Sequence, residues 1–169
     1  HNGDLAAIVE SAGGDAIRLV ETVRDSLPSY RDFAQYNGTK VWLLKRAQIL
    51  AADLYGALAG NGLGDLARIE MLTTFADYKI PQILRHFGVM RYSDRLAQAV
   101  DGRTQLPAGS RLEVEVRAAT VWAVELLRAE LLNLGIDRTP VQLDWLLWEE
   151  SQTINQHAQP YHRTLTIYY

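Results

Sequence analysis

The stretch TTFADYKIPQILRHFGVMRYSDRL, residues 73–96, contains the turn that decides the fold. A helix is predicted over residues 80–87, with Pro81 in its first turn, where the missing N–H of proline costs no hydrogen bond. Gly88 is the natural end of this helix, and Ser93 is placed to cap a second short helix. Two short helices joined by a tight glycine turn form a helix-hairpin-helix-like pattern, which indicates a helical domain.

The rest of the chain is also mostly typical of helices. The alternating residues LEVEV, 112–116, resemble a strand, but Ser110 and Glu113 form a capping box and the apolar pattern continues as a helix. We therefore predict an all-α fold with SYRDFAQYNG, 29–38, as a loop and an extended tail over residues 159–169. Asp15 is placed to cap the second expected helix, and Thr139, Pro140 and Gln142 form the N-terminal signature of the last one. The expected helices cover residues 4–11, 15–27, 39–58, 80–87, 94–100, 110–134 and 140–154, with a short helix or turn at 66–72.

Length and composition narrow the possible classes of protein. The 169 residues suit a single domain over 1–169, with 48% apolar and 22% charged residues and a net charge of −3. This charge argues against duplex nucleic acid as a partner, because phosphate backbones require a concentrated basic face. The absence of cysteine excludes disulfides and thiol nucleophiles. No apolar run reaches the roughly 18 residues of a membrane span, and we expect a cytoplasmic protein with no membrane partner.

Asp77 is the first candidate site residue, because it lies among Phe75, Ala76 and Tyr78 rather than on a polar helix face. One interpretation is a cap for the helix that follows, since aspartate is a preferred N-cap residue. The other is a catalytic carboxylate in an apolar pocket, where its charge needs a positive partner or a developing cation. Phe75 and Tyr78 are then candidate substrate-binding residues.

Lys45 and Asp144 are the next candidates. Lys45 lies in the apolar stretch WLLKRAQIL, either as a lysine with its ammonium in water or as a buried lysine paired with a carboxylate or a phosphate. Asp144 lies one turn before Trp148 on the same arc of a helix. It is either an acid that complements the helix dipole or a carboxylate that faces a heteroaromatic ligand.

The tail PYHRTLTIYY, residues 160–169, is the last candidate. His162 and Arg163 offer donors suited to a phosphate, and the tyrosines offer stacking faces. A clamp that ties down the fold is the alternative. The common signatures of nucleotide, metal and serine-hydrolase sites are missing from the sequence, so we expect neither a cofactor nor a metal. The candidates together are enough to hold a nucleotide-like ligand.

Several motifs, in the same order along the chain, resemble the queuosine salvage protein family. They are LPSYRD (27–32), KRAQILAAD (45–53), TTFADYKIPQILRHFGVMRYSDRL (73–96), EVEVRAATVWAVELL (113–127), LDWLLWEE (143–150) and PYHRTLTIYY (160–169).

The resemblance implies an all-α fold similar to the helix-hairpin-helix DNA glycosylases. It also implies an N-glycosidase that cleaves queuosine 5′-phosphate and releases queuine, a small-molecule substrate and product, for tRNA modification. The key lysine of the family falls on Lys45, and its two key aspartates fall on Asp77 and Asp144. Family members carry a substantial N-terminal half, so we expect this chain to be the C-terminal part of a longer one, with the segment before His1 as a partner of the pocket.

The roles expected from this chemistry follow from the charge of the transition state. Glycosidic hydrolysis passes through an oxocarbenium-like state, which a fixed Asp77 carboxylate stabilises. Asp144 reads or protonates the base, and Lys45 holds the phosphate or sets the charge of a neighbouring aspartate. Two alternatives remain: a DNA-repair-type base glycosylase, and a non-enzymatic helical interaction module whose buried charges are structural ion pairs.

Overall fold

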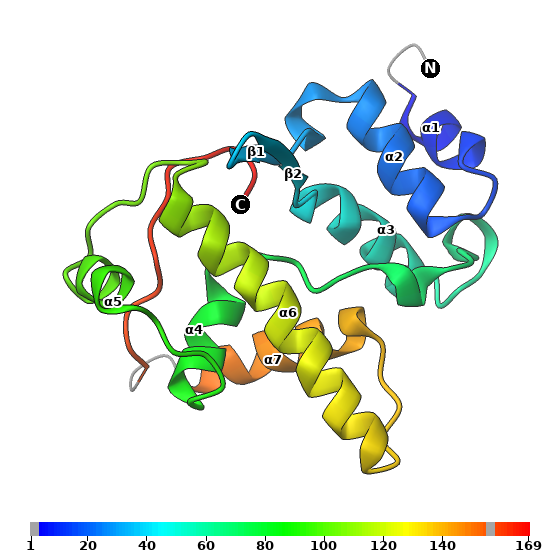
Figure 1. The fold of residues 1–169 in the computed structure, drawn as a ribbon. Coiled ribbons are helices and arrows are strands. Elements are labelled where there is room, and N and C mark those ends of the chain that lie inside the picture. The colour runs from blue at the N-terminus through cyan, green and yellow to red at the C-terminus, as the bar shows by residue number, and fades with distance from the viewer. Residues whose placement is uncertain (1–3, 155–157) are drawn as a thin grey trace.

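The computed structural model describes residues 4–154 and 158–169, and the fold in these residues is mostly helical (Figure 1). They form seven α-helices, three short 3-10 helices and one two-stranded antiparallel sheet. The α-helices are α1 (Leu5–Ser11), α2 (Ala16–Ser26), α3 (Lys45–Ala57), α4 (Lys79–His86), α5 (Asp94–Asp101), α6 (Arg111–Asn133) and α7 (Pro140–Thr153). The strands are β1 (Phe33–Tyr36) and β2 (Thr39–Trp42), and the 3-10 helices are Pro28–Tyr30, Gly62–Gly64 and Ile69–Met71.

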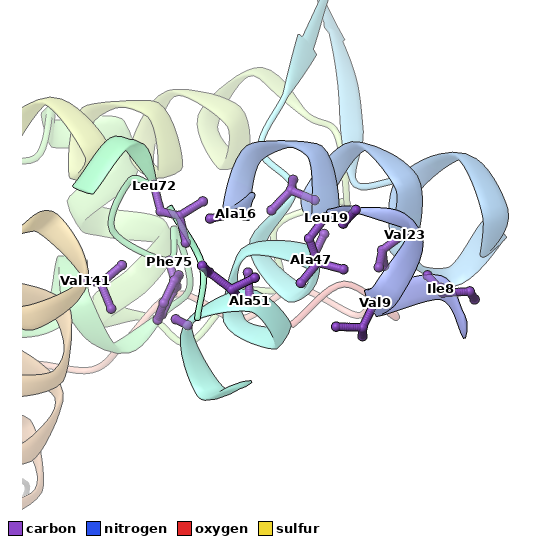
Figure 2. Close-up of a cluster of buried hydrophobic side chains, with 14 residues drawn as sticks. Ile8, Val9, Ala16, Leu19, Val23, Ala47, Ala51, Leu72, Phe75 and Val141 are labelled. Atoms are coloured by element: carbon purple, nitrogen blue, oxygen red, sulfur yellow. The ribbon is translucent and has the colours of Figure 1, made fainter. Parts of the chain in front are cut away.

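Helices α1, α2 and α3 pack around the first of two hydrophobic clusters (Figure 2). Leu19 and Val23 of α2 face Ala47 and Ala51 of α3, and the small alanines allow the two helices to approach closely. The predicted cap at Asp15 is confirmed, because its carboxylate accepts a hydrogen bond from the backbone N–H of Arg18 at 2.8 Å.

The hairpin corrects the prediction of a loop over 29–38 and of a helix that begins at Thr39. Asn37 and Gly38 both have positive φ, as a two-residue hairpin turn requires, and Phe33 pairs with Trp42 across the strands with ring centroids 5.2 Å apart. The Asn-Gly pair is a strong hairpin signal, which here overrides the helical apolar spacing of the residues that follow. Helix α3 therefore begins six residues later than predicted, at Lys45.

Helices α4 to α7 enclose the second cluster, which includes Ile80, Leu84, Val100, Val124 and Leu143. The long helix α6 contains residues 112–116, which confirms the helical interpretation of this stretch over the strand. It runs diagonally across α7 (Figure 1).

Capping at the starts of α6 and α7 follows the predictions only in part. The predicted capping box at Ser110 is wrong: the Ser110 hydroxyl makes no cap bond, and Glu113 accepts a hydrogen bond from the N–H of Gly109 at 3.1 Å rather than from that of Ser110. The capping box of Thr139 and Gln142 is confirmed.

The C-terminal segment is extended, as predicted, and returns beside the start of α6 to the hairpin (Figure 1). The carbonyl of Arg163 accepts a hydrogen bond from the N–H of Leu106 at 2.7 Å, and that of Ile167 accepts one from Nη1 of Arg46 at 3.0 Å. The tail thus joins the two halves of the molecule.

Two segments pass from one hydrophobic cluster to the other, and the candidate aspartates lie on them. Phe75 belongs to the first cluster and Ile80 to the second, with Asp77 between them. Val141 belongs to the first cluster and Leu143 to the second, and Asp144 follows Leu143 directly. The two carboxylates are therefore held at the boundary between two packed cores. In the described residues no helix has the length and hydropathy needed to cross a lipid bilayer.

Candidate active site

A cavity of about 420 Å³ lies at this boundary and brings together three of the charged residues expected from the sequence. Lys45 enters it from the first residue of α3, Asp77 from the segment just before α4, and Asp144 from the first turns of α7. The complete lining is Lys45, Ile49, Asp53, Phe75, Asp77, Asp144, Trp145 and Trp148. An apolar and aromatic wall with a few convergent charged groups is typical of a small-molecule site.

Asp77 is both a helix cap and a cavity residue. Its Oδ1 accepts hydrogen bonds from the backbone N–H groups of Lys79 at 2.7 Å and Ile80 at 3.0 Å. The side chain is buried, with 7% exposed, and this burial raises the pKa of Asp77 against the opposing effects of the Ile80 amide and the Lys45 ammonium. The two interpretations of this residue are therefore compatible, since the bonds that cap α4 also fix the carboxylate in the cavity wall.

Asp144 is held by the segment that leads to Asp77. Its Oδ1 accepts a hydrogen bond from the Thr74 hydroxyl at 2.5 Å and one from the Phe75 N–H at 2.7 Å. Burial raises the pKa of Asp144 to about 7, with a further contribution from the charge of Asp77, while the two hydrogen bonds and Lys45 act in the opposite direction. A carboxyl group of this kind is partly protonated at neutral pH and can donate a proton.

Lys45 supplies the positive charge of the cavity. Its ammonium lowers the pKa of both Asp77 and Asp144, which places it in electrostatic reach of each. Lys45 also lines a neighbouring cavity of about 440 Å³, together with Tyr30, Arg46 and Tyr169. The lysine therefore stands between an aromatic, acidic cavity and a more basic one.

Comparison with known proteins shows the family to which the chain belongs. The family model described as queuosine salvage protein matches residues 1–169. The chain belongs to the queuosine salvage protein family.

Three curated relatives carry the name queuosine 5′-phosphate N-glycosylase/hydrolase. The protein of Sphaerobacter thermophilus is 47% identical over 167 residues, that of Dictyostelium discoideum 40% over 169, and that of Mus musculus 37% over 176. Each alignment covers 99% of this chain but 52% of the relative, so the chain spans about half the length of the curated relatives it matches.

The other candidate residues from the sequence are divided between the cavity and its surroundings. Phe75 and Trp148 line the cavity, and Trp148 remains 48% exposed. Tyr78 instead packs against the rings of Tyr161 and Tyr169, with centroids 4.7 and 6.5 Å away. Its place is behind the site, among the aromatic rings of the tail.

The structure does not bring His162 and Arg163 to the cavity. His162 is buried, with Nε2 3.3 Å from the Tyr169 hydroxyl, and burial together with the charge of Arg117 lowers its pKa to about 4. It is therefore neutral near pH 7 and lacks the charge expected of a phosphate ligand. Arg163 is exposed and lines a separate cleft with Arg103.

Three cavity and framework residues were missed by the sequence reasoning. Asp53, the last residue of the stretch KRAQILAAD that was already singled out, lines the cavity together with Trp145. Asp32 and Arg117 are buried behind it as a salt bridge of 2.6 Å between residues 85 positions apart. Their motifs LPSYRD and EVEVRAATVWAVELL were noted, but no local pattern pairs them. Among the described residues no cluster of three or more His, Cys, Asp or Glu side chains is arranged to hold a metal.

Proposed function

We propose that the full-length protein hydrolyses the N-glycosidic bond of queuosine 5′-phosphate and releases queuine for tRNA modification. The observation that carries this proposal is the shared cavity of Lys45, Asp77 and Asp144, in a chain 37–47% identical to relatives that bear this enzyme name. Membership of the family and the charged and aromatic lining of the cavity both support this reaction.

Asp77 is the residue we assign to the developing cation. The transition state of glycoside hydrolysis carries positive charge on the ribose, and a fixed carboxylate stabilises it more than it stabilises the neutral substrate. The bonds from the N–H groups of Lys79 and Ile80 fix this carboxylate before substrate arrives. Because the carboxylate is already fixed, it does not have to reorient when the positive charge develops, as water molecules would.

Asp144 and the two tryptophans are assigned to the base. A deazaguanine ring needs a stacking surface, which Trp145 and Trp148 supply along the cavity wall. With a pKa of about 7, Asp144 can accept hydrogen bonds from the base when ionised and donate a proton to the leaving base when protonated. The interaction between the two aspartates favours one charged and one neutral carboxyl group at neutral pH.

The 5′-phosphate is assigned to the boundary of the two cavities. Lys45 lines both, and Arg46 lines the neighbouring one with its guanidinium 4.9 Å from the Tyr30 ring. These two cations replace His162, which is neutral near pH 7, and Arg163, which lines a separate cleft, as the proposed phosphate ligands.

The fold likeness to helix-hairpin-helix DNA glycosylases belongs to the same proposal. Helices α4 and α5, joined by the turn at Gly88 with φ of 72°, are the elements that support it. DNA itself is a poor candidate substrate, since the net charge of −3 opposes duplex binding. A purely structural role for the aspartates leaves unexplained why two of them share one cavity, where their repulsion raises the pKa of Asp144.

The test is release of queuine by the full-length protein. Queuosine 5′-phosphate, queuosine and guanosine 5′-phosphate are incubated separately with the enzyme, and free bases are quantified by liquid chromatography and mass spectrometry. We expect queuine from the queuosine nucleotide, with a lower kcat/KM for the nucleoside that lacks the phosphate. The Asp77→Asn variant should release queuine far more slowly than the wild type. Asp94→Asn, changed at an exposed acid of α5, is its matched control. Absence of queuine with the wild-type enzyme contradicts the proposal.

A further inference from the structure

Arg117 of α6 is buried directly behind the cavity and makes four hydrogen bonds. Its Nη1 and Nη2 donate to Oδ1 and Oδ2 of Asp32 at 3.0 and 2.6 Å, in a bidentate pair. Nη1 also donates to Oε1 of Glu113 at 3.2 Å, and Nε donates to the carbonyl oxygen of Ala76 at 2.8 Å. The guanidinium has 3% of its side chain exposed and is not among the cavity-lining residues. Its bonds are therefore directed at the protein rather than at a ligand.

The bonds to Asp32 lead to Lys45. Oδ2 of Asp32 accepts a hydrogen bond from the backbone N–H of Lys45 at 3.1 Å, and the carbonyl of Asp32 accepts from the N–H groups of Leu43 and Leu44 at 3.0 and 3.2 Å. A carboxylate at this place also complements the positive end of the α3 dipole. Asp32 therefore fixes the first turn of α3 although it precedes that helix by more than ten residues.

Leu44 shows that this turn is held in an unfavourable conformation. Its φ and ψ are 50° and 31°, in the left-handed region that a leucine rarely adopts. Such a residue persists only where its surroundings over-determine the backbone. The bonds from Asp32 supply that constraint, and the turn directs the next residue, Lys45, into the cavity.

The remaining bond leads to Asp77. Ala76, whose carbonyl accepts from Nε of Arg117, is the residue immediately before Asp77. On the other side Asp77 is fixed by the amides that it caps. One guanidinium thus bonds to Asp32, which fixes the backbone of Lys45, and to the carbonyl of Ala76, which precedes Asp77. The segments that carry Lys45 and Asp77 lie far apart in the sequence.

The C-terminal tail packs against this guanidinium as well. The ring of Tyr169 lies 4.5 Å from Cζ of Arg117, and its hydroxyl donates to Oε1 of Glu113 at 2.8 Å. Arg117 is therefore enclosed by ionic, aromatic and backbone partners, which leaves the fork little freedom to move.

We propose that Arg117 is a positioning residue for the reaction: through Asp32 it sets Lys45, and through the carbonyl of Ala76 it sets Asp77. This inference rests on the proposed hydrolase activity. A lysine in its place keeps the charge but loses the planar fork that reaches two acceptors in different segments at once. Misplacement of reacting groups by about 1 Å can cost on the order of 10²-fold in rate.

The experiment compares Arg117→Lys with the wild type in the full-length protein. We expect kcat to fall by about 10²-fold, because the distance between the charged groups changes, with a smaller rise in KM, because Lys45 is one of the proposed phosphate ligands while the aromatic wall of the cavity is unchanged. Arg128→Lys is the matched control on the same helix, since Arg128 pairs only with Glu125, at 3.0 Å, among its described partners and is partly exposed. It should leave both constants unchanged. Asp32→Asn, which has the same shape, is the second variant and should reproduce the loss of kcat.

Amide hydrogen exchange gives a readout that does not depend on turnover. In Arg117→Lys the amide of Lys45, bonded to Asp32 in the wild type, should exchange faster, whereas the amide of Ile80 should change less. Unchanged kcat in a folded Arg117→Lys or Asp32→Asn variant, or unchanged exchange at Lys45, overturns the inference. A wild-type protein without hydrolase activity instead refutes the proposed function, and the exchange data then still report whether Arg117 fixes the Lys45 turn.

Discussion

The hydroxyl group of Thr74 lies 2.5 Å from Oδ1 of Asp144 and donates a hydrogen bond to it across 70 positions of sequence. This bond joins the segment that carries Asp77 to the helix that carries the second carboxylate. Because the hydroxyl favours the charged form of Asp144, it lowers a pKa that burial raises. The relationship therefore sets both the geometry and the protonation of the site.

Replacement of Thr74 by valine should raise the pKa of Asp144 further and destabilise the fold. Valine has nearly the same shape but leaves a buried acceptor with one donor fewer, at a cost of about 1–3 kcal/mol. Urea denaturation at pH 7.5 measures the loss, and Thr104→Val, at an exposed loop position, is the control. Equal unfolding free energies for Thr74→Val and the wild type would show that the bond is not needed.

The stability of the protein should depend on the charge of Asp144. Its pKa is about 7 in the folded state against an ordinary value of 3.8, so the folded state holds the proton more tightly than the unfolded chain. The stabilisation is complete below about pH 4 and is lost as the pH rises through 7. A shift of this size corresponds to roughly 4 kcal/mol. In Asp144→Asn this dependence should disappear from thermal unfolding curves recorded between pH 4 and pH 8, whereas it should persist in Asp137→Asn, an exposed neighbour.

Asp77 and Asp144 should respond differently to substitution. Asp77→Asn keeps a good helix cap and hence the fold, but it should lower kcat by about 10²–10³-fold because the charge that faces the cation is gone. Asp144→Ala should weaken the binding of free queuine as well as substrate, since the donors of the base are left unpaired. Calorimetric titration of queuine into both variants separates the roles. Wild-type affinity for queuine in Asp144→Ala removes this residue from base recognition.

Trp148 should contribute to binding more than to chemistry. It lines the cavity from α7 and is half-exposed, so its removal takes away a stacking face without opening the core. We expect Trp148→Ala to weaken queuine binding by about 1–3 kcal/mol, the range seen for base stacking on aromatic side chains. Leu146→Ala, on the same helix and 53% exposed, is the matched control. Equal affinities in the two variants would place the base elsewhere.

Much of the helical framework could be predicted from the sequence because its signals are local. The caps at Asp15 and at Thr139 with Gln142, and the proline at the start of α4, act within one turn of the helix that they define. Asp77 and Asp144 stood out for a related reason, since a carboxylate within an apolar stretch needs a special explanation wherever the chain places it.

What only the tertiary structure decided depends on contacts between distant residues. The hairpin was missed although its Asn-Gly turn is a local signal, and the cross-strand pair of Phe33 and Trp42 stabilises it over the predicted loop and helix. His162 and Arg163 are adjacent in sequence, yet one is buried and neutral and the other exposed, since their neighbours come from other parts of the chain. The pairing of Arg117 with Asp32 has the same origin. Burial and long-range charge, which no local pattern encodes, decided which of the candidate residues share the cavity.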